Sequence, residues 1–150
     1  HNAVFVGMDK SGAPRHAHKH STAAQGGFKG NAPGSEPEYS FHWTGGSEAL
    51  YLFEAPIDML SFITLRQRCW RNHSYAAACG VSDKVLWRML EDYPYIRKVY
   101  LCLDSDEAGQ TAAKRIAEKL KSRNIEYENL VPILKDWNEV LLCSQKENAQ

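Results

Sequence analysis

The sequence predicts an α/β fold in which a parallel sheet of about four strands is flanked by helices and preceded by an antiparallel amino-terminal extension. Three observations indicate this class. Apolar strand-like runs alternate with helix-like segments after residue 48. Those runs are continuously apolar, as expected for a sheet covered on both faces. In addition, 43% of the 150 residues are hydrophobic, which is enough for the core of one compact domain.

The extension, assigned to residues 1–49, is rich in turn-forming residues. Gly, Pro, Ala and Asn dominate its middle part, a composition typical of a loop. Apolar and polar residues alternate near its end, as in a half-buried antiparallel strand. The predicted order is a strand, a hairpin turn, a partner strand, a long loop and a further antiparallel strand, at residues 4–8, 9–12, 13–22, 23–37 and 39–43.

The second part, residues 50–150, is predicted to form the α/β core. Its apolar runs predict four strands, at residues 50–53, 75–79, 99–103 and 127–131. Between them, apolar residues recur at helical spacing. The predicted helices are residues 57–68, a second helix with Ser82 as its N-cap, and a third that begins at residue 108.

Bulk properties exclude several classes of protein. Lys plus Arg and Asp plus Glu each number 18, so any contact with nucleic acid has to come from a local patch. Apolar runs are too short to span a bilayer and no signal peptide is visible, which predicts a cytoplasmic protein without a membrane partner. The scattered cysteines form no CxxC pair and are expected to be buried and reduced. The abrupt start on His1 suggests a fragment of a longer protein.

Acidic residues follow two of the predicted strands. Glu54 follows the first strand, and Asp104 and Asp106 follow the third. Because ligands of parallel sheets bind outside the carboxyl ends of the strands, these side chains are expected to converge. Asp58, one helical turn after Glu54, and Asp136, after the fourth strand, complete the set.

Converging carboxylates repel one another unless a cation neutralises them. Oxygen ligands favour magnesium or manganese over zinc, so the pattern predicts a site for Mg²⁺ or Mn²⁺. The alternative interpretation is that each acid caps the helix that follows it, where a negative charge contributes about 0.3–1 kcal/mol.

These segments resemble the Toprim domain shared by bacterial primases, type IA and type II topoisomerases and some nucleases, a Rossmann-like fold. A strand ending in Glu54, with Asp58 four residues later, is similar to the first Toprim motif of primases. The glycine turn, the DxDxxG motif and a segment with a further acid follow in the same order, at residues 79–82, 103–109 and 135–139.

The resemblance implies that Glu54 is the general acid or base, and that Asp104 and Asp106 hold magnesium against a phosphate. Primase-like nucleotidyl transfer fits best, with strand cleavage or hydrolysis as alternatives. Two departures from the family pattern, Ala55 and Asn138, would weaken metal binding.

Residues 1–49 lack the basic character of the primase extension, and the chain is more similar to Toprim-like domains in proteins of conjugative plasmids and transposons. The implied setting is the bacterial cytoplasm. The implied partners are DNA, with single strands favoured, or RNA, and other domains of the same longer protein, such as a helicase or relaxase. The competing hypothesis is a non-catalytic module that binds nucleic acid or a replication partner.

Basic and aromatic residues carry weaker signals. Arg15, Lys19, Lys29 and Lys135 are candidates for phosphate contacts. His16, His18 and His20 alternate and would share one strand face. We expect that face to be solvated or to contact nucleic acid rather than to hold a metal. Trp70, Trp87 and Trp137 could stack on bases, but core packing is the favoured interpretation of Trp87 and Trp137. The cluster of Arg66, Arg68 and Arg71 is most simply a polar helix end.

Overall fold

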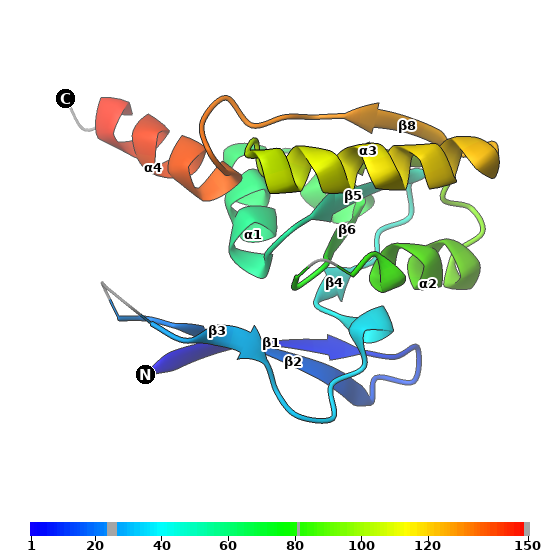
Figure 1. Ribbon diagram of the computed structural model, residues 1–150, viewed down its shortest axis with the longest axis horizontal. Helices are drawn as coiled ribbons and strands as arrows, with labels where there is room; N and C mark the ends of the chain where they lie inside the picture. The colour runs from blue at the N-terminus through cyan, green and yellow to red at the C-terminus, as the bar shows by residue number, and fades with distance from the viewer. Residues whose placement is uncertain (24–26, 81, 149–150) are drawn as a thin grey trace.

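The computed structural model describes residues 1–23, 27–80 and 82–148, in which a three-stranded sheet lies beside an α/β part (Figure 1). The α/β part contains a five-stranded sheet with the order β4-β6-β5-β7-β8. The last four of these strands pair in parallel, as predicted. The strands are β4 (His42–Trp43), β5 (Ala49–Phe53), β6 (Ser74–Ala77), β7 (Lys98–Leu101) and β8 (Glu126–Asn129).

The edge strand β4 differs from its prediction in length and in place. It pairs antiparallel with β6, through His42 opposite Ala76 and Trp43 opposite Tyr75, and so joins the α/β sheet. Only two of the five residues predicted as strand belong to it. The 3-10 helix η1 (Pro37–Tyr39), which begins at a proline, takes up the start of the predicted strand.

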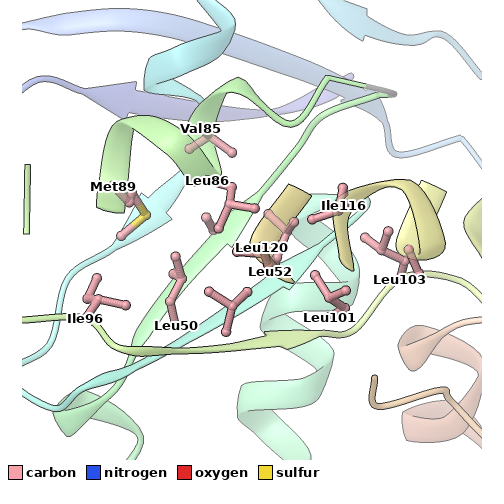
Figure 2. Packing of buried hydrophobic residues seen from close by; sticks show 13 residues of the cluster. Leu50, Leu52, Val85, Leu86, Met89, Ile96, Leu101, Leu103, Ile116 and Leu120 are labelled. Atoms are coloured by element: carbon pink, nitrogen blue, oxygen red, sulfur yellow. The ribbon is translucent and has the colours of Figure 1, made fainter. Parts of the chain in front are cut away.

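Helices cover both faces of the five-stranded sheet. They are α1 (Pro56–Leu65), α2 (Lys84–Asp92), α3 (Glu107–Ser122) and α4 (Trp137–Asn148). On one face, Leu50 and Leu52 of β5 pack with α2 and α3 (Figure 2). On the other face, Phe53 packs with Phe62 of α1 and Trp137 of α4. The alternation along one strand therefore supplies both cores.

Several helix ends differ from the predictions. Helix α1 begins with Pro56 in its first turn and ends at Leu65, three residues before the predicted end. Asp83, not Ser82, occupies the N-cap position of α2. Helix α4 was not predicted at all, although its first residues lie in the last resemblance motif.

The amino-terminal sheet consists of β1 (Asn2–Met8), β2 (Pro14–Ser21) and β3 (Lys29–Asn31), which pair antiparallel in chain order. Strands β1 and β2 form the predicted hairpin. Asp9 closes its turn, because one carboxylate oxygen accepts hydrogen bonds from the backbone N–H groups of Ser11 and Ala13. Strand β3 corrects the prediction of an uninterrupted loop.

This sheet rests against the C-terminal end of β6 and against α2. Phe5 of β1 packs edge-to-face on Phe41, with ring centroids 5.4 Å apart. The Lys10 ammonium donates to the Asp92 carbonyl at 2.7 Å. Residues of β1 and β2 that face these contacts form what we call the inner face of the sheet, and the opposite side is its outer face.

The edge strand β8 is short, exposed and charged. Its carboxylates Glu126 and Glu128 both approach the Lys98 ammonium, at 3.0 and 3.3 Å. All four cysteines are free; Cys79 and Cys102 are buried as predicted, whereas Cys69 and Cys143 are exposed. None of the helices formed by the described residues is long and apolar enough to cross a membrane.

Candidate functional site

Glu54 lies where the sequence places it, directly after β5 at the carboxyl end of the parallel sheet. Its backbone carbonyl accepts the N–H of Cys79, which ties the end of β5 to the end of β6. The side chain is half-buried. Burial raises the pKa of Glu54, and the carboxylate of Asp106 adds to the rise, whereas the positive charges of Lys29 and Lys135 oppose it.

Asp104 follows β7 and is held by its backbone. Its carbonyl accepts a hydrogen bond from the Gln110 side chain at 2.8 Å. Gly109 packs so closely beneath it that a Cβ there would lie 2.4 Å from the same carbonyl oxygen. The Asp104 Oδ1 atom is buried and has no hydrogen-bond partner among the described residues. This is an unusual situation, because buried polar atoms are normally paired.

The protonation of Asp104 reflects its acidic neighbours. Burial raises its pKa to about 7, and the four carboxylates of Glu54, Asp58, Asp136 and Asp106 act in the same direction. The five predicted acids therefore share one region. The negative charge of Asp104 is therefore unfavourable in this region unless the carboxyl binds a proton or a cation lies beside it.

The other acids have structural partners. Asp106 caps α3 by accepting the N–H of Gly109 at 2.8 Å, and Asp136 caps α4 through the N–H of Glu139 at 2.8 Å. For these two, the helix-capping interpretation holds. Asp58 does not cap its own helix but accepts the N–H of Asn138 at 3.2 Å. Burial raises the pKa of Asp58 to about 6, with Asp136 as the next cause.

Two contacts join the loop after β7 to the start of α4. Both the N–H and the hydroxyl of Ser105 donate to the Lys135 carbonyl, at 2.8 and 3.1 Å. The Trp137 indole N–H donates to the Cys102 carbonyl at 3.0 Å. These bonds bring Asp136 and Lys135 to the end of the sheet that carries Glu54 and Asp104.

The donor set suits a hard cation, although the side chains do not yet converge. Every candidate ligand is a carboxylate oxygen, and Asp104 offers a buried oxygen without a partner. Within the described ranges of the chain, no three His, Cys, Asp or Glu side chains are close enough to hold an ion as they stand. Ion binding would require at least one carboxylate to turn toward the others.

The predicted basic residues separate into two groups. Lys29 of β3 and Lys135 lie near the acids, since the charge of each lowers the pKa of Glu54. Arg15 instead pairs with Glu36 at 3.0 Å. Lys19 lies opposite Val4 in the β1–β2 ladder and so belongs to the exposed outer face of the amino-terminal sheet. The structure thus brings Lys29 and Lys135 to the acidic region but not Arg15 or Lys19.

The histidines correct another expectation. His16, His18 and His20 do share one face of β2, but it is the inner face, and His16 and His18 are only 3% and 2% exposed. His18 bonds the Asn31 side chain at 2.7 Å, whereas both ring nitrogens of His16 lack a partner among the described residues. Burial lowers the pKa of His16, and the neighbouring His18 adds to the effect.

A small pocket beside Glu54 includes Arg115, which is not among the predicted site residues. Its lining includes Gly80, Ser82 and, from α3, Ala108, Ala112 and Arg115. The available signal was the spacing of Ala108, Ala112 and Arg115, which places them on one side of a helix. The Glu54 side chain therefore borders a small, partly enclosed pocket.

Comparison with known proteins separates the two parts of the chain. A family model described as Toprim-like matches residues 51–141. A second model, described as a protein of unknown function, matches residues 1–48. An uncharacterised protein of Mycoplasma pneumoniae, named as an MG010 homolog, is 33% identical over 126 residues. That match covers 80% of this chain and 57% of the relative.

Solved structures with a similar fold are primase domains. The primase fragment of the bacteriophage T7 primase-helicase protein superposes with a TM-score of 0.70 at 21% identity, over 97% of this chain and 60% of that one. A DNA primase domain from Pseudomonas aeruginosa gives 0.65 at 16% identity, over 99% of this chain and 49% of that one. The chain therefore shares their fold and spans about half to two thirds of their length.

Proposed function

Because this chain belongs to the Toprim-like family, we propose that it is the metal-dependent domain of a DNA-processing protein and acts on phosphodiesters by primase-like nucleotidyl transfer. The observation that carries the proposal is Asp104, whose buried, unpartnered oxygen lies among four other carboxylates. No hydrogen bond from the described residues accounts for the burial of this oxygen. A divalent cation bound there would neutralise the negative charge of the surrounding carboxylates.

In this proposal Asp104 and Asp106 hold Mg²⁺ or Mn²⁺, and Asp58 and Asp136 contribute negative charge around them. The ion, when bound, would offset the charge that develops on phosphoryl oxygens. Glu54 exchanges a proton with the attacking or leaving oxygen. Its half-buried carboxyl and raised pKa favour that role, because an acid–base group works best with a pKa near the ambient pH.

Lys29 and Lys135 are proposed to contact phosphates. Both carry positive charge beside Glu54, and they come from different parts of the chain. A nucleic-acid strand at the acidic region would meet several carboxylates, so these two ammonium groups add a local attraction that the neutral net charge lacks. We propose that this chain is one domain of a larger DNA-processing protein of a mobile element, and that this larger protein acts in the bacterial cytoplasm.

The test is a matched pair of Glu→Gln variants assayed for nucleotide incorporation and strand cleavage on single-stranded DNA with manganese. Glu54→Gln should lower turnover by about 10²–10⁴-fold and leave nucleic-acid binding almost unchanged. Glu118→Gln, on the exposed side of α3, removes the same charge away from the site and should have no effect. Turnover that survives Glu54→Gln would refute the catalytic role.

A non-catalytic binding module is the second candidate function. It is favoured by the hydrogen bonds that already engage three of the acids: Asp106 and Asp136 cap helices, and Asp58 accepts the N–H of Asn138. In such a module no turnover is detected in this chain or in the longer natural protein. Glu54→Gln would then tighten binding, since it removes a negative charge close to phosphates.

A further inference from the structure

We propose that the opposite end of the five-stranded sheet carries a second binding site, which holds single-stranded nucleic acid without a metal ion. The site, here called the tryptophan–arginine patch, consists of Trp43 of β4 and residues 66–73 between α1 and β6. These residues precede β6, whereas the acidic region lies beyond its other end. The inference is independent of the proposed catalytic function.

The patch holds a local excess of positive charge. Residues 66–73 include Arg66, Arg68 and Arg71 and no acidic residue. All three arginines are exposed, and none forms an ion pair with another described residue. Because the chain as a whole is neutral, attraction of a polyanion depends on local excesses of positive charge such as this one. The planar guanidinium group suits phosphate oxygens in particular.

Aromatic surface lies directly beside one of these charges, the Arg71 guanidinium. The Trp43 side chain is 41% exposed, a large fraction for an indole, and packs against Trp70 with ring centroids 5.1 Å apart. Its N–H donates to the Arg71 carbonyl at 3.4 Å, which fixes the orientation of the ring. The Arg71 guanidinium lies 5.5 Å from the Trp70 ring centroid. An exposed indole close to a guanidinium group is the combination that stacks bases while it contacts the phosphate backbone.

The patch is held in place before any ligand binds. The Asn72 carbonyl accepts the N–H of Ser47 at 2.7 Å, and the Ser47 hydroxyl lies 2.8 Å from His73 Nδ1. Gly45 packs against Asn72 and His73 so tightly that a Cβ would lie 2.4 Å from the His73 carbonyl oxygen. A loop fixed in this way loses little conformational entropy on binding, which favours affinity.

A nucleic-acid strand fits these features better than an acidic protein segment. Both ligands would neutralise the arginines, but only a nucleic acid supplies flat bases for the exposed face of Trp43. Stacking on indole tolerates any base, so the site should show little sequence preference. It would hold a strand while the acidic region acts on another part of that strand.

The experiment measures fluorescence anisotropy of a labelled oligothymidylate of about 20 nucleotides, with the whole chain in EDTA. The double variant Arg68→Ala, Arg71→Ala should bind at least roughly tenfold more weakly. Its slope of log affinity against log salt should fall by about 1.4, or about 0.7 for each lost phosphate contact. The control Lys114→Ala, Lys121→Ala removes the same charge from exposed positions of α3 and should bind like wild type.

Trp43 is tested separately. Trp43→Ala should weaken binding by roughly 5- to 100-fold with an unchanged salt slope, because it removes stacking and no charge. Trp43→Phe keeps an aromatic face and should retain most of the affinity. Should Trp43→Ala fail to fold, which a thermal melt reveals, Trp43→Phe and the arginine variant, whose side chains are exposed, still decide the question.

Three outcomes would overturn the inference. The first is that wild type does not bind the oligonucleotide in EDTA. The second is that the lysine control loses as much affinity as the arginine variant. The third is that oligoglutamate competes as well as DNA while Trp43→Ala has no effect. The last outcome would indicate an acidic protein partner. The catalytic proposal is tested by turnover with manganese and this one by binding without metal, so failure of one is distinguishable from failure of the other.

Discussion

The acidic end of the five-stranded sheet and the inner face of the amino-terminal sheet both bury polar atoms that lack hydrogen-bond partners among the described residues. At the first, the atom is Asp104 Oδ1; at the second, the atoms are both ring nitrogens of His16 and Nε2 of His18. The chemistry of the two groups differs. An imidazole loses its charge near neutral pH and can be buried as a neutral ring, whereas a carboxylate stays charged unless a proton or cation reaches it.

We propose that this difference distinguishes a functional site from a packing site. Burial raises the pKa of Asp104 and lowers the pKa of His16, so both groups tend toward the neutral form. For His16 the neutral form is the ordinary state at pH 7.5, and nothing further is required. For Asp104, four neighbouring carboxylates make the charged form costly. In our proposal, the unpartnered oxygen of Asp104 reflects a ligand that binds there, whereas the unpartnered nitrogens of His16 reflect only exclusion of water.

The largest expected effect is stabilisation by magnesium. At a concentration 100-fold above its dissociation constant, an ion that binds only the native state stabilises it by about 2.7 kcal/mol. Differential scanning fluorimetry should show a rise of several degrees for wild type and none for the double variant Asp104→Asn, Asp106→Asn. The control Glu118→Gln, Glu147→Gln, which removes two exposed carboxylates, should respond fully. A full response from the Asp104 variant would move the metal site elsewhere.

The next effect concerns pH in metal-free protein. A carboxyl with a raised pKa binds its proton more tightly in the native state, so its contribution to stability is lost as pH rises from about 4 to about 7. Asp104→Asn removes this penalty and should raise the free energy of unfolding by about 1–3 kcal/mol at pH 8, with little change at pH 4. Urea titrations in EDTA at both pH values provide the measurement. A variant less stable than wild type at pH 8 would contradict the account.

A smaller effect of opposite sign is expected from the histidines. Because the pKa of His16 is lowered on folding, the unfolded state binds more protons, and stability is lost as pH falls through the ordinary histidine range near 6.5. His16→Leu should reduce that acid sensitivity in urea titrations between pH 7.5 and pH 5. His20→Gln, at a half-buried position whose Nδ1 bonds the Ser21 carbonyl, serves as the control. Equal acid sensitivity in wild type and His16→Leu would remove His16 as the cause.

The smallest expected effect is that of zinc on the inner face. No group of three potential ligands occurs among the described residues, so His16 and His18 should not retain a metal. Elemental analysis of the purified chain should find no stoichiometric zinc. Zinc present in wild type and lost from the triple variant His16→Ala, His18→Ala, His20→Ala would make the two regions alike rather than different.

Local patterns predicted the elements that position the acids. Strands β5 and β7 were predictable because each lies in a short, continuous apolar run, although β7 ends at Leu101, two residues before the predicted end. Strand β3 was not, since Lys29 and Gly30 carry no strand signal and depend on pairing with β2. Helix α4 was not predicted because its apolar residues do not gather on one side of the helix, so their spacing predicts no amphipathic helix. The division of the chain between residues 49 and 50 stays a prediction.

The candidate site was predictable as far as strand ends determine it. Glu54, Asp104 and Asp106 follow strands, and the topology brings strand ends together. Lys29 was one of several basic residues predicted to contact phosphates. The packing of the amino-terminal sheet brings Lys29 near the acids, whereas Arg15 forms an ion pair with Glu36 instead. Alternation likewise predicted that His16 and His18 share a face. It could not predict which face is covered, because that depends on the tertiary contacts.

The charged edge strand β8 affects how copies of the molecule meet one another. Unpaired backbone groups at the edge of a sheet attract strands from other molecules and so promote aggregation. Strand β8 has only four residues, and two of them are Glu126 and Glu128. A second copy that approached edge to edge would bring its own carboxylates to the same place, and their repulsion opposes strand addition. Replacing both residues by valine would therefore be expected to lower solubility well before it changed the fold.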